Sequence, residues 1–220
     1  MRILIVSDIH SNSSAVARVR DKALKEHVEV LLICGDITHF GTVQASESIL
    51  KELSYSSKVL FVHGNCDPVA LSKIEKSGNA ENLHSRHLNI DGLSFIGSGG
   101  SLKTPFRTRI EYTEEQISKH LQKASLEIAD KRVIVVSHDP PFNTKLDRIY
   151  SGEHVGSKAL REFILTKEPI IVTCGHIHEG RGIDKVSNSI VVNSGPTFNG
   201  YCALAEIKGN QVIVELSILD

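Results

Sequence analysis

Two histidines one residue apart, His176 and His178, are the residues of this sequence best suited to bind a metal ion. They follow the segment 168–173, a mostly β-branched apolar run that is typical of a buried strand. Alternate side chains of an extended chain share a face, so both imidazoles can turn toward one point or two adjacent points. Neutral imidazole is the commonest metal ligand, and Gly175 lets the backbone turn before the pair. A His-x-His pair on its own is more often two solvated loop residues.

Four other apolar segments end in side chains of the same chemical kind, which favours the metal site. Together they supply carboxylate, amide and imidazole groups, and this set suits manganese, iron, zinc or nickel better than calcium. The candidate ligands outnumber those that one tetrahedral ion needs. They suit two ions about 3.5–4 Å apart that share a carboxylate. In chain order, the candidate ligands are Asp8, His10, Asp36, Asn65, His138, His176 and His178.

The segments between these strand ends alternate between strand and helix patterns. Parallel strands joined by helices place their carboxyl ends at one edge of a sheet, where open α/β sheets hold their sites. A hairpin is expected around Asp91-Gly92, and the last four strands are expected to form a meander. Predicted strands cover residues 2–7, 28–34, 58–62, 88–90, 93–96, 132–137, 168–173, 182–186, 189–193, 201–207 and 212–216. Predicted helices cover residues 13–26, 42–53, 68–77, 113–129 and 157–165.

The composition restricts the class of protein. A chain of 220 residues without repeats or linkers is expected to form a single domain over residues 1–220. It has no run of eighteen apolar residues, and its first apolar run is too short for a signal peptide, so a cytoplasmic protein outside the membrane is expected. The net charge of −1 gives no general attraction for nucleic acid. The four cysteines form no close pair, so reduced thiols are expected.

The polar motifs, taken in order, resemble those of the calcineurin-like metallophosphoesterases. That family's series runs Asp-x-His, Gly-Asp, Gly-Asn-His-Asp/Glu, a lone His and Gly-His-x-His. Each motif alone is weak, but the ordered set is specific and spans most of the chain. Segments 137–141, 154–161 and 175–180 look closest to a branch of predicted cytosolic phosphoesterases related to cyclic-nucleotide phosphodiesterases. The matching residues are Asp8-Ile9-His10, Gly35-Asp36, Gly64-Asn65-Cys66-Asp67, His138 and Gly175-His176-Ile177-His178.

This resemblance implies an α/β fold, a two-sheet sandwich flanked by helices, with metals held above the sheet edges. Two divalent transition-metal ions are the expected cofactors, with manganese favoured over iron, zinc or nickel. The resemblance also implies two ligand triads and one shared carboxylate. The triads are Asp8, His10 and His178 for one ion and Asn65, His138 and His176 for the other, with Asp36 bridging them.

The residue after the Gly-Asn pair departs from the family pattern. Many members have a histidine there that contacts the scissile phosphate and can protonate the leaving oxygen, whereas this chain has Cys66. A thiol, with an ordinary pKa of about 8.5, is no cation at neutral pH and supplies little acid catalysis. Leaving groups of low pKa should therefore react best. Catalytic roles are predicted for Asn65, Cys66 and Asp67, and for His39 as a substrate contact.

The predicted function is hydrolysis of a phosphodiester through a metal-bridging hydroxide that attacks phosphorus in line. The expected partner is a small phosphodiester or nucleotide substrate. Lys103, Arg107 and Arg109, in the long polar loop 97–109, are candidate phosphate contacts, and a solvated basic stretch is the alternative.

Two other functions stay open at this point. One is a metal-containing binding or scaffold module with little turnover, which Cys66 favours. The other is a nuclease, which the near-zero net charge and the lack of a basic aromatic stripe disfavour. Short exposed strand edges near the carboxyl end make a homodimer plausible.

Overall fold

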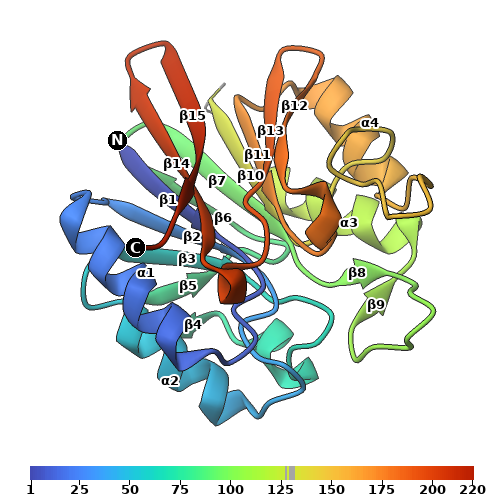
Figure 1. Ribbon diagram of the computed structural model, residues 1–220. Helices are drawn as coiled ribbons and strands as arrows, with labels where there is room; N and C mark the ends of the chain where they lie inside the picture. The colour runs from blue at the N-terminus through green and yellow to red at the C-terminus, as the bar shows by residue number, and fades with distance from the viewer. Residues whose placement is uncertain (127, 129–131) are drawn as a thin grey trace.

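The computed structural model describes residues 1–126, 128 and 132–220. Within these residues two β-sheets pack face to face, and helices cover both outer faces (Figure 1). The predicted two-sheet α/β sandwich is therefore confirmed. The first sheet has the order β15 (Gln211–Ile218), β14 (Tyr201–Lys208), β1 (Arg2–Val6), β2 (Val30–Cys34), β3 (Lys58–Val62), β5 (Ala80–Asn82) and β4 (Lys76–Ser77). The second has the order β12 (Gly182–Val186), β13 (Ser189–Asn193), β11 (Ile171–Cys174), β10 (Val133–Ser137), β7 (Leu93–Ser98) and β6 (His87–Ile90).

The central strands are continuous apolar runs because both of their faces are buried. In β1, Ile3 and Ile5 face the second sheet, while Leu4 and Val6 face the helices. Phe95 of β7 belongs to the same inner core as Ile3 and Ile5. This alternation follows from the two-residue period of a strand. The shared core holds the carboxyl ends of the two sheets in a fixed relation to each other.

Four helices supply the outer layers. α1 (Ser13–Lys25) and α2 (Val43–Leu53) pack on the first sheet, and α3 (Glu114–Ser125) and α4 (Lys158–Lys167) pack on the second (Figure 1). Each helix begins after a side-chain cap that accepts a backbone N–H, which satisfies a donor left free at a helix start. The caps are Asn12, Thr42, Thr113 and Ser157.

Parallel pairing brings the strand ends together as the sequence predicts. β1, β2 and β3 run parallel in the first sheet, and β7, β10, β11 and β13 run parallel in the second. Their carboxyl ends therefore meet at one edge of the sandwich. In the described part of the chain no helix is long and apolar enough to cross a membrane.

The expected carboxyl-terminal meander is wrong, although all four of its strands exist. β12 and β13 join the second sheet, where β13 lies parallel to β11. β14 and β15 join the first sheet, where β14 lies antiparallel to β1. Each pair is a local hairpin, but the segment 194–200 carries the chain from one sheet to the other. Apolar alternation identifies a strand without identifying its neighbour, which is why the sequence pattern did not separate the two hairpins.

Two predicted helices also need correction. The helix expected over residues 68–77 is a short 3-10 helix, η1 (Val69–Lys73), followed by β4. It buries only Leu71, which is too little apolar contact to hold a longer amphipathic helix. The helix expected over 113–129 is α3, and the described helix ends at Ser125, while residues 127 and 129 lie outside the described residues. The hairpin at Asp91-Gly92 is confirmed, with positive φ at both residues.

Candidate metal centre

A first group of possible metal ligands lies beyond the ends of β1 and β11. It consists of Asp8, His10 and His178, whose ligand atoms lie within 4.8 Å of one another. His178 Nε2 is 3.4 Å from Asp8 Oδ1, and His10 Nε2 is 3.9 Å from the same oxygen. Asp8 Oδ1 is buried and accepts no hydrogen bond from the described residues. A buried carboxylate oxygen without a donor is costly, so this oxygen is well suited to a cation.

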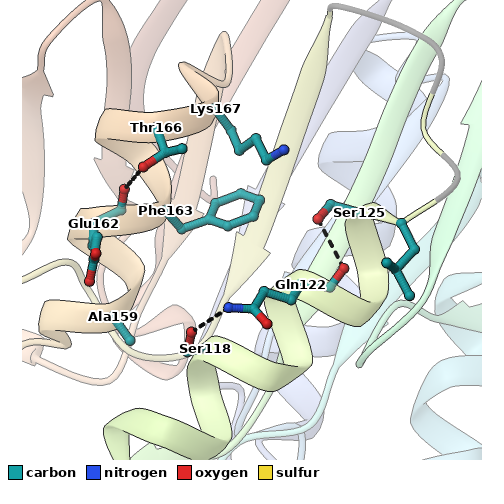
Figure 2. A pocket seen from close by; sticks show the side chains of 9 residues that line it. Ser118, Gln122, Ser125, Ala159, Glu162, Phe163, Thr166 and Lys167 are labelled. Carbon is teal, nitrogen blue, oxygen red and sulfur yellow. Dashed lines mark hydrogen bonds between the residues drawn. The ribbon is translucent and has the colours of Figure 1, made fainter.

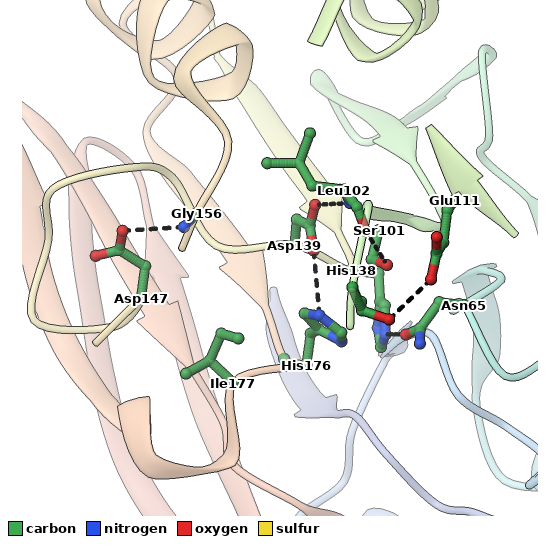
Figure 3. Close-up of polar contacts among 12 residues, drawn as sticks. Asn65, Ser101, Leu102, Glu111, His138, Asp139, Asp147, Gly156, His176 and Ile177 are labelled. Carbon is green, nitrogen blue, oxygen red and sulfur yellow. Dashed lines mark hydrogen bonds and ion pairs between the residues drawn. The ribbon is translucent and has the colours of Figure 1, made fainter. Parts of the chain in front are cut away.

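A second group lies where the two sheets meet. It consists of Asp8, Asp36 and His138, and His138 is fully buried. The Nδ1–H of His138 donates to the carbonyl oxygen of Cys34 at 2.6 Å, and Nε2 faces Asp36 Oδ1 at 3.7 Å. That Nε2 lies 2.8 Å from Asn65 Oδ1, which is also an acceptor (Figure 3). A ring nitrogen and an oxygen acceptor this close need a proton or a cation between them, so this geometry also suits a metal ion.

The carboxylate of Asp36, a member of the second group, also faces a histidine of the first group. Its Oδ2 is 3.6 Å from Nε2 of His10, and its Oδ1 is 3.7 Å from Nε2 of His138. Oδ1 also accepts the N–H of Cys66 at 2.8 Å. Burial raises the pKa of Asp36 to about 7, and the carboxylates of Asp67 and Asp8 act in the same direction while His138 opposes them. A bound cation would reverse this effect, because it favours the ionised carboxyl.

His176 lies beside the second group without being a member of it. Its ring centroid is 4.9 Å from that of His138, and its backbone N–H donates to Asp8 Oδ2 at 3.1 Å. Its Nε2 is 3.7 Å from Asp139 Oδ1 (Figure 3). Asp139 is buried and also accepts the N–H of Leu102 at 2.6 Å. A carboxylate beside a ligand histidine commonly fixes its ring orientation, and we assign Asp139 that positioning role.

Several residues at this edge adopt backbone conformations that residues other than glycine rarely adopt. Asp8, His10, Asp36 and His176 have φ angles of 55°, 49°, 48° and 64°. Left-handed φ at such residues is uncommon and concentrates at functional sites, where the surrounding structure stabilises it. Four of the predicted ligands are therefore held in turns that aim their side chains at the edge between the sheets.

Comparison with known proteins identifies the chain. A model of the calcineurin-like phosphoesterases matches residues 1–180. The chain belongs to this family. Its members are metal-dependent phosphoesterases, which accords with the ligand groups described above. A protein of unknown function from Methanocaldococcus jannaschii is 40% identical over 219 residues, covering 98% of this chain and 96% of that protein.

Solved structures support the same fold. A protein from Thermus thermophilus superposes with a TM-score of 0.81 at 18% identity, covering all of this chain and 99% of its own. A structure described as a novel archaeal phosphodiesterase gives a TM-score of 0.55 at 16% identity, covering 99% of this chain and 100% of its own. At these identities the likeness concerns the fold alone.

In this phosphoesterase the buried Asp67 connects the two loops that carry Asp36 and Asn65. Its buried carboxylate accepts the N–H groups of Ile37, Thr38 and Gly64 and the hydroxyl of Thr38, at 2.8–3.2 Å. These bonds tie the loop that carries Asp36 to the loop that carries Asn65. Asp67 thus holds the two loops together, and the catalytic role that the sequence predicts for it stays a prediction.

Asn193 is a positioning residue that the sequence motifs did not reveal. It is buried at the end of β13, and its Nδ2 donates to the carbonyl oxygens of Ile177 at 2.8 Å and Gly175 at 3.3 Å. These bonds hold the segment between His176 and His178. The only sequence signal is a polar residue directly after an apolar strand.

Cys66 and His39 lie at the outer side of the first group. The Sγ of Cys66 and ring nitrogens of His39 and His10 lie within 4.8 Å of one another. Cys66 is 8% exposed, and burial raises the pKa of its thiol above the ordinary value, as does the charge of Asp36. The thiol is therefore neutral at physiological pH. His39 is exposed, and its ring centroid is 5.1 Å from that of His10.

The three basic residues of the long loop differ in their surroundings. Arg109 donates to the carbonyl oxygens of Phe40 at 2.8 Å and Gly41 at 2.7 Å, so its guanidinium holds the loop next to His39. Lys103 and Arg107 are exposed, and their side chains form no hydrogen bond or ion pair with the described residues. All three residues lie in the segment 103–110, between β8 (Ser101–Leu102) and β9 (Glu111–Tyr112).

A separate hollow lies away from these ligand groups. Figure 2 shows it between α3 and α4, where it measures about 540 Å³. Ser118, Gln122 and Phe163 line it, and Gln122 donates to the Ser118 hydroxyl. None of the candidate ligand groups among the described residues lies there. The candidate ligand groups lie at the sheet edge instead.

Three further histidines form a separate cluster behind the Asn65 loop. The ring centroid of His84 is 4.5 Å from that of His63 and 4.3 Å from that of His120, and Tyr112 stacks on His84. Nδ1 of His84 accepts the N–H of Gly99 at 3.0 Å. Burial, together with the charges of His120, Arg86 and Lys123, lowers the pKa of His84 to about 3.

Replacing His84 with asparagine should make the protein's stability less sensitive to acid. The unfolded chain binds a proton at His84 below a pH of about 6.5, whereas the folded protein does so only near pH 3. Stability from this residue is thus present at pH 7 and declines as the pH falls toward 3. The free energy of unfolding, measured with urea, should fall between pH 7 and pH 5 in wild type. In His84→Asn this fall should be smaller by about 1 kcal/mol. His27→Asn, at an exposed position, is the control, and an equal loss in both variants would contradict the expectation.

Proposed function

We propose that this phosphoesterase is a dinuclear, metal-dependent phosphodiesterase whose two ions share the carboxylate of Asp36. The observation that carries this proposal is that the two oxygens of Asp36 face different histidines, His10 and His138, at 3.6 and 3.7 Å. A carboxylate in that position can bind one ion through each oxygen. The ordered spacing of the ligands along the chain supports the same assignment.

The ligand sets are those that the family resemblance implies. The first coincides with the first group, whereas in the second only His138 belongs to a group, with Asn65 and His176 beside it. One ion would be held by Asp8, His10 and His178, and the other by Asn65, His138 and His176. The mixture of carboxylate, amide and imidazole favours manganese, with iron, zinc or nickel as other candidates. When bound, the ions would lower the pKa of a coordinated water and neutralise charge on the phosphoryl oxygens.

The residues around the ions would then determine which phosphoesters react. The buried, neutral thiol of Cys66 supplies neither a cation nor an efficient acid, so the leaving oxygen would depart unprotonated. His39, exposed beside His10, is available to donate a hydrogen bond to a phosphoryl oxygen. Lys103 and Arg107 remain candidates for contacts to a second charged group of the substrate. This arrangement favours diesters with a leaving group of low pKa.

The expected result with purified protein and manganese is hydrolysis of bis(p-nitrophenyl) phosphate at least about 10-fold faster than hydrolysis of p-nitrophenyl phosphate. A chelator should abolish both reactions, and magnesium should substitute poorly because it prefers all-oxygen octahedral coordination. Asn65→Ala should reduce the rate by at least about 100-fold, since it removes a ligand beside the attacked phosphorus. Asn79→Ala, at an exposed turn, is the matched control.

A faster monoesterase, a chelator-resistant rate or a higher rate with magnesium than with manganese would contradict this proposal. Because Cys66 replaces a group that donates protons, a metal-containing binding module with little turnover is the second candidate. Full binding of two ions without hydrolysis of either aryl substrate would favour that second function. Cleavage of single-stranded DNA faster than of the aryl diester would favour a nuclease instead.

A further inference from the structure

An open cavity of about 380 Å³ lies against the first ligand group. Its lining consists of His10, Asn12, His39, His178 and Phe198. His10 and His178 are proposed ligands of the first ion, so any group that fills this cavity lies directly beside the reacting phosphate. The chemistry of the remaining lining residues therefore bears on which phosphoesters the protein accepts.

Phe198 forms one side of this cavity. Its ring centroid is 5.5 Å from those of both His10 and His178, with interplanar angles of 56° and 68°. The ring of His39 also packs edge-on against His10, at 5.1 Å. Other rings thus contact both imidazoles of the first group.

The position of Phe198 is set by the same strand end that carries Asp8. Phe198 lies in η3 (Thr197–Asn199), and its N–H donates to the carbonyl oxygen of Asp8 at 3.2 Å. The N–H of Thr197 donates to the carbonyl oxygen of Ser7 at 2.8 Å, and the Thr197 hydroxyl accepts the N–H of Ser7 at 3.2 Å. These bonds hold the ring in a defined place relative to the metal ligands.

The segment that carries His39 is also held in place. The ring of Phe40 lies 4.9 Å from that of His39, and the guanidinium carbon of Arg109 lies 5.3 Å from the centre of the Phe40 ring. Arg109 also binds the carbonyl oxygens of Phe40 and Gly41. His39 therefore belongs to an anchored segment, although its own side chain is exposed.

The lining suits a flat apolar group better than a second charge. Phe198 offers a π-face, and no lysine or arginine lines the cavity among the described residues. The side-chain oxygen of Asn12 is already used to cap α1. A nucleobase or aryl ring stacks on such a face with little dependence on the polar groups at its edge.

We propose that Phe198 binds an aromatic group, an aryl ring or a nucleobase, carried by an ester group of the phosphorus that the metal centre holds. This specificity rests on the proposed phosphodiesterase function. It assigns a role to a residue outside the metal-binding motifs, on the segment that links the two sheets. Phe198 then determines which ester group is preferred, and the metal ligands determine where the phosphorus lies.

The test compares two phosphonates that are not hydrolysed, phenylphosphonate and methylphosphonate, by calorimetric titration of the manganese-loaded protein. Wild type should bind phenylphosphonate at least about 10-fold more tightly. Phe198→Ala and the milder Phe198→Leu should bring the ratio of the two dissociation constants toward one. Adenosine monophosphate and ribose 5-phosphate provide the same comparison for a nucleobase. Tyr55→Leu, at an aromatic residue exposed far from the site, is the control.

A purely structural role for Phe198 gives a different result. If the ring only supported His10 and His178, its loss would lower metal content and weaken both phosphonates equally, leaving the ratio unchanged. That outcome, or a ratio near one in wild type, would overturn the proposal. Failure of the proposed hydrolysis is distinguishable, because a preference for phenylphosphonate that depends on Phe198 needs no turnover.

Discussion

Replacing Asp36 with alanine should lower the occupancy of both metal ions and reduce phosphodiester hydrolysis by at least about 1,000-fold. The carboxylate lies between His10 and His138, so its removal takes one oxygen ligand from each ion. Its absence also leaves the Cys66 N–H without its acceptor at 2.8 Å. Asp36→Asn keeps that acceptor while removing the charge, and it separates loss of metal from loss of local structure. Elemental analysis and calorimetric manganese titration provide the measurements.

Two single-ligand variants are the controls for the Asp36 experiment. His178→Ala should weaken mainly the ion bound by Asp8, and His138→Ala should weaken mainly the other, because neither histidine lies between the two groups. Each should retain about one ion per chain under conditions that saturate wild type. Full metal content in both Asp36 variants would refute the shared-carboxylate model.

Replacing Gly64 with alanine should disrupt the same metal site, because the added methyl group would collide with Asp36. A Cβ at this glycine would overlap Oδ1 and the backbone nitrogen of Asp36, atoms that cannot move without displacing the ligand. Overpacking against fixed backbone typically costs about 1–3 kcal/mol. Gly64→Ala should therefore lower the free energy of unfolding by about 3 kcal/mol and abolish binding of both ions.

Gly209→Ala is the matched control for this substitution. Gly209 has a φ of 56°, but nothing lies within 4 Å of an added Cβ. The strain of a left-handed alanine should cost about 1 kcal/mol without affecting metal content. Urea unfolding of the metal-free proteins and manganese titration would measure both effects. The overlap argument fails if Gly64→Ala binds manganese as wild type does.

The candidate ligands were predictable from the sequence because their placement is a local property of the chain. An apolar run that ends in a polar residue indicates a strand end, and parallel strands joined by helices bring such ends to one edge. Asp8, His10, Asp36, His138 and His178 accordingly occur in the ligand groups at that edge. The extension of one domain over residues 1–220 and the catalytic parts of Cys66 and His39 stay predictions.

The supporting residues could not be predicted, because their contacts join positions far apart in the chain. Asn193 binds the carbonyl oxygen of a residue 16 positions away, and Asp139 accepts from Leu102, 37 positions away. The hydrogen bonds of Asp67 likewise join it to the loop of Asp36, 29 and 30 positions away.

Strand periodicity and the order of the motifs along the chain are enough to predict the candidate ligands. The division of the carboxyl-terminal strands between the sheets is visible only in the folded protein, because a strand's apolar pattern leaves its neighbour unspecified. That division sends the segment 194–200 from one sheet to the other and brings Phe198 beside Asp8. The half-buried ring of Phe198 therefore lies beside the candidate ligands because of the way the strands pair. This pairing is non-local, since it depends on the packing of the whole core.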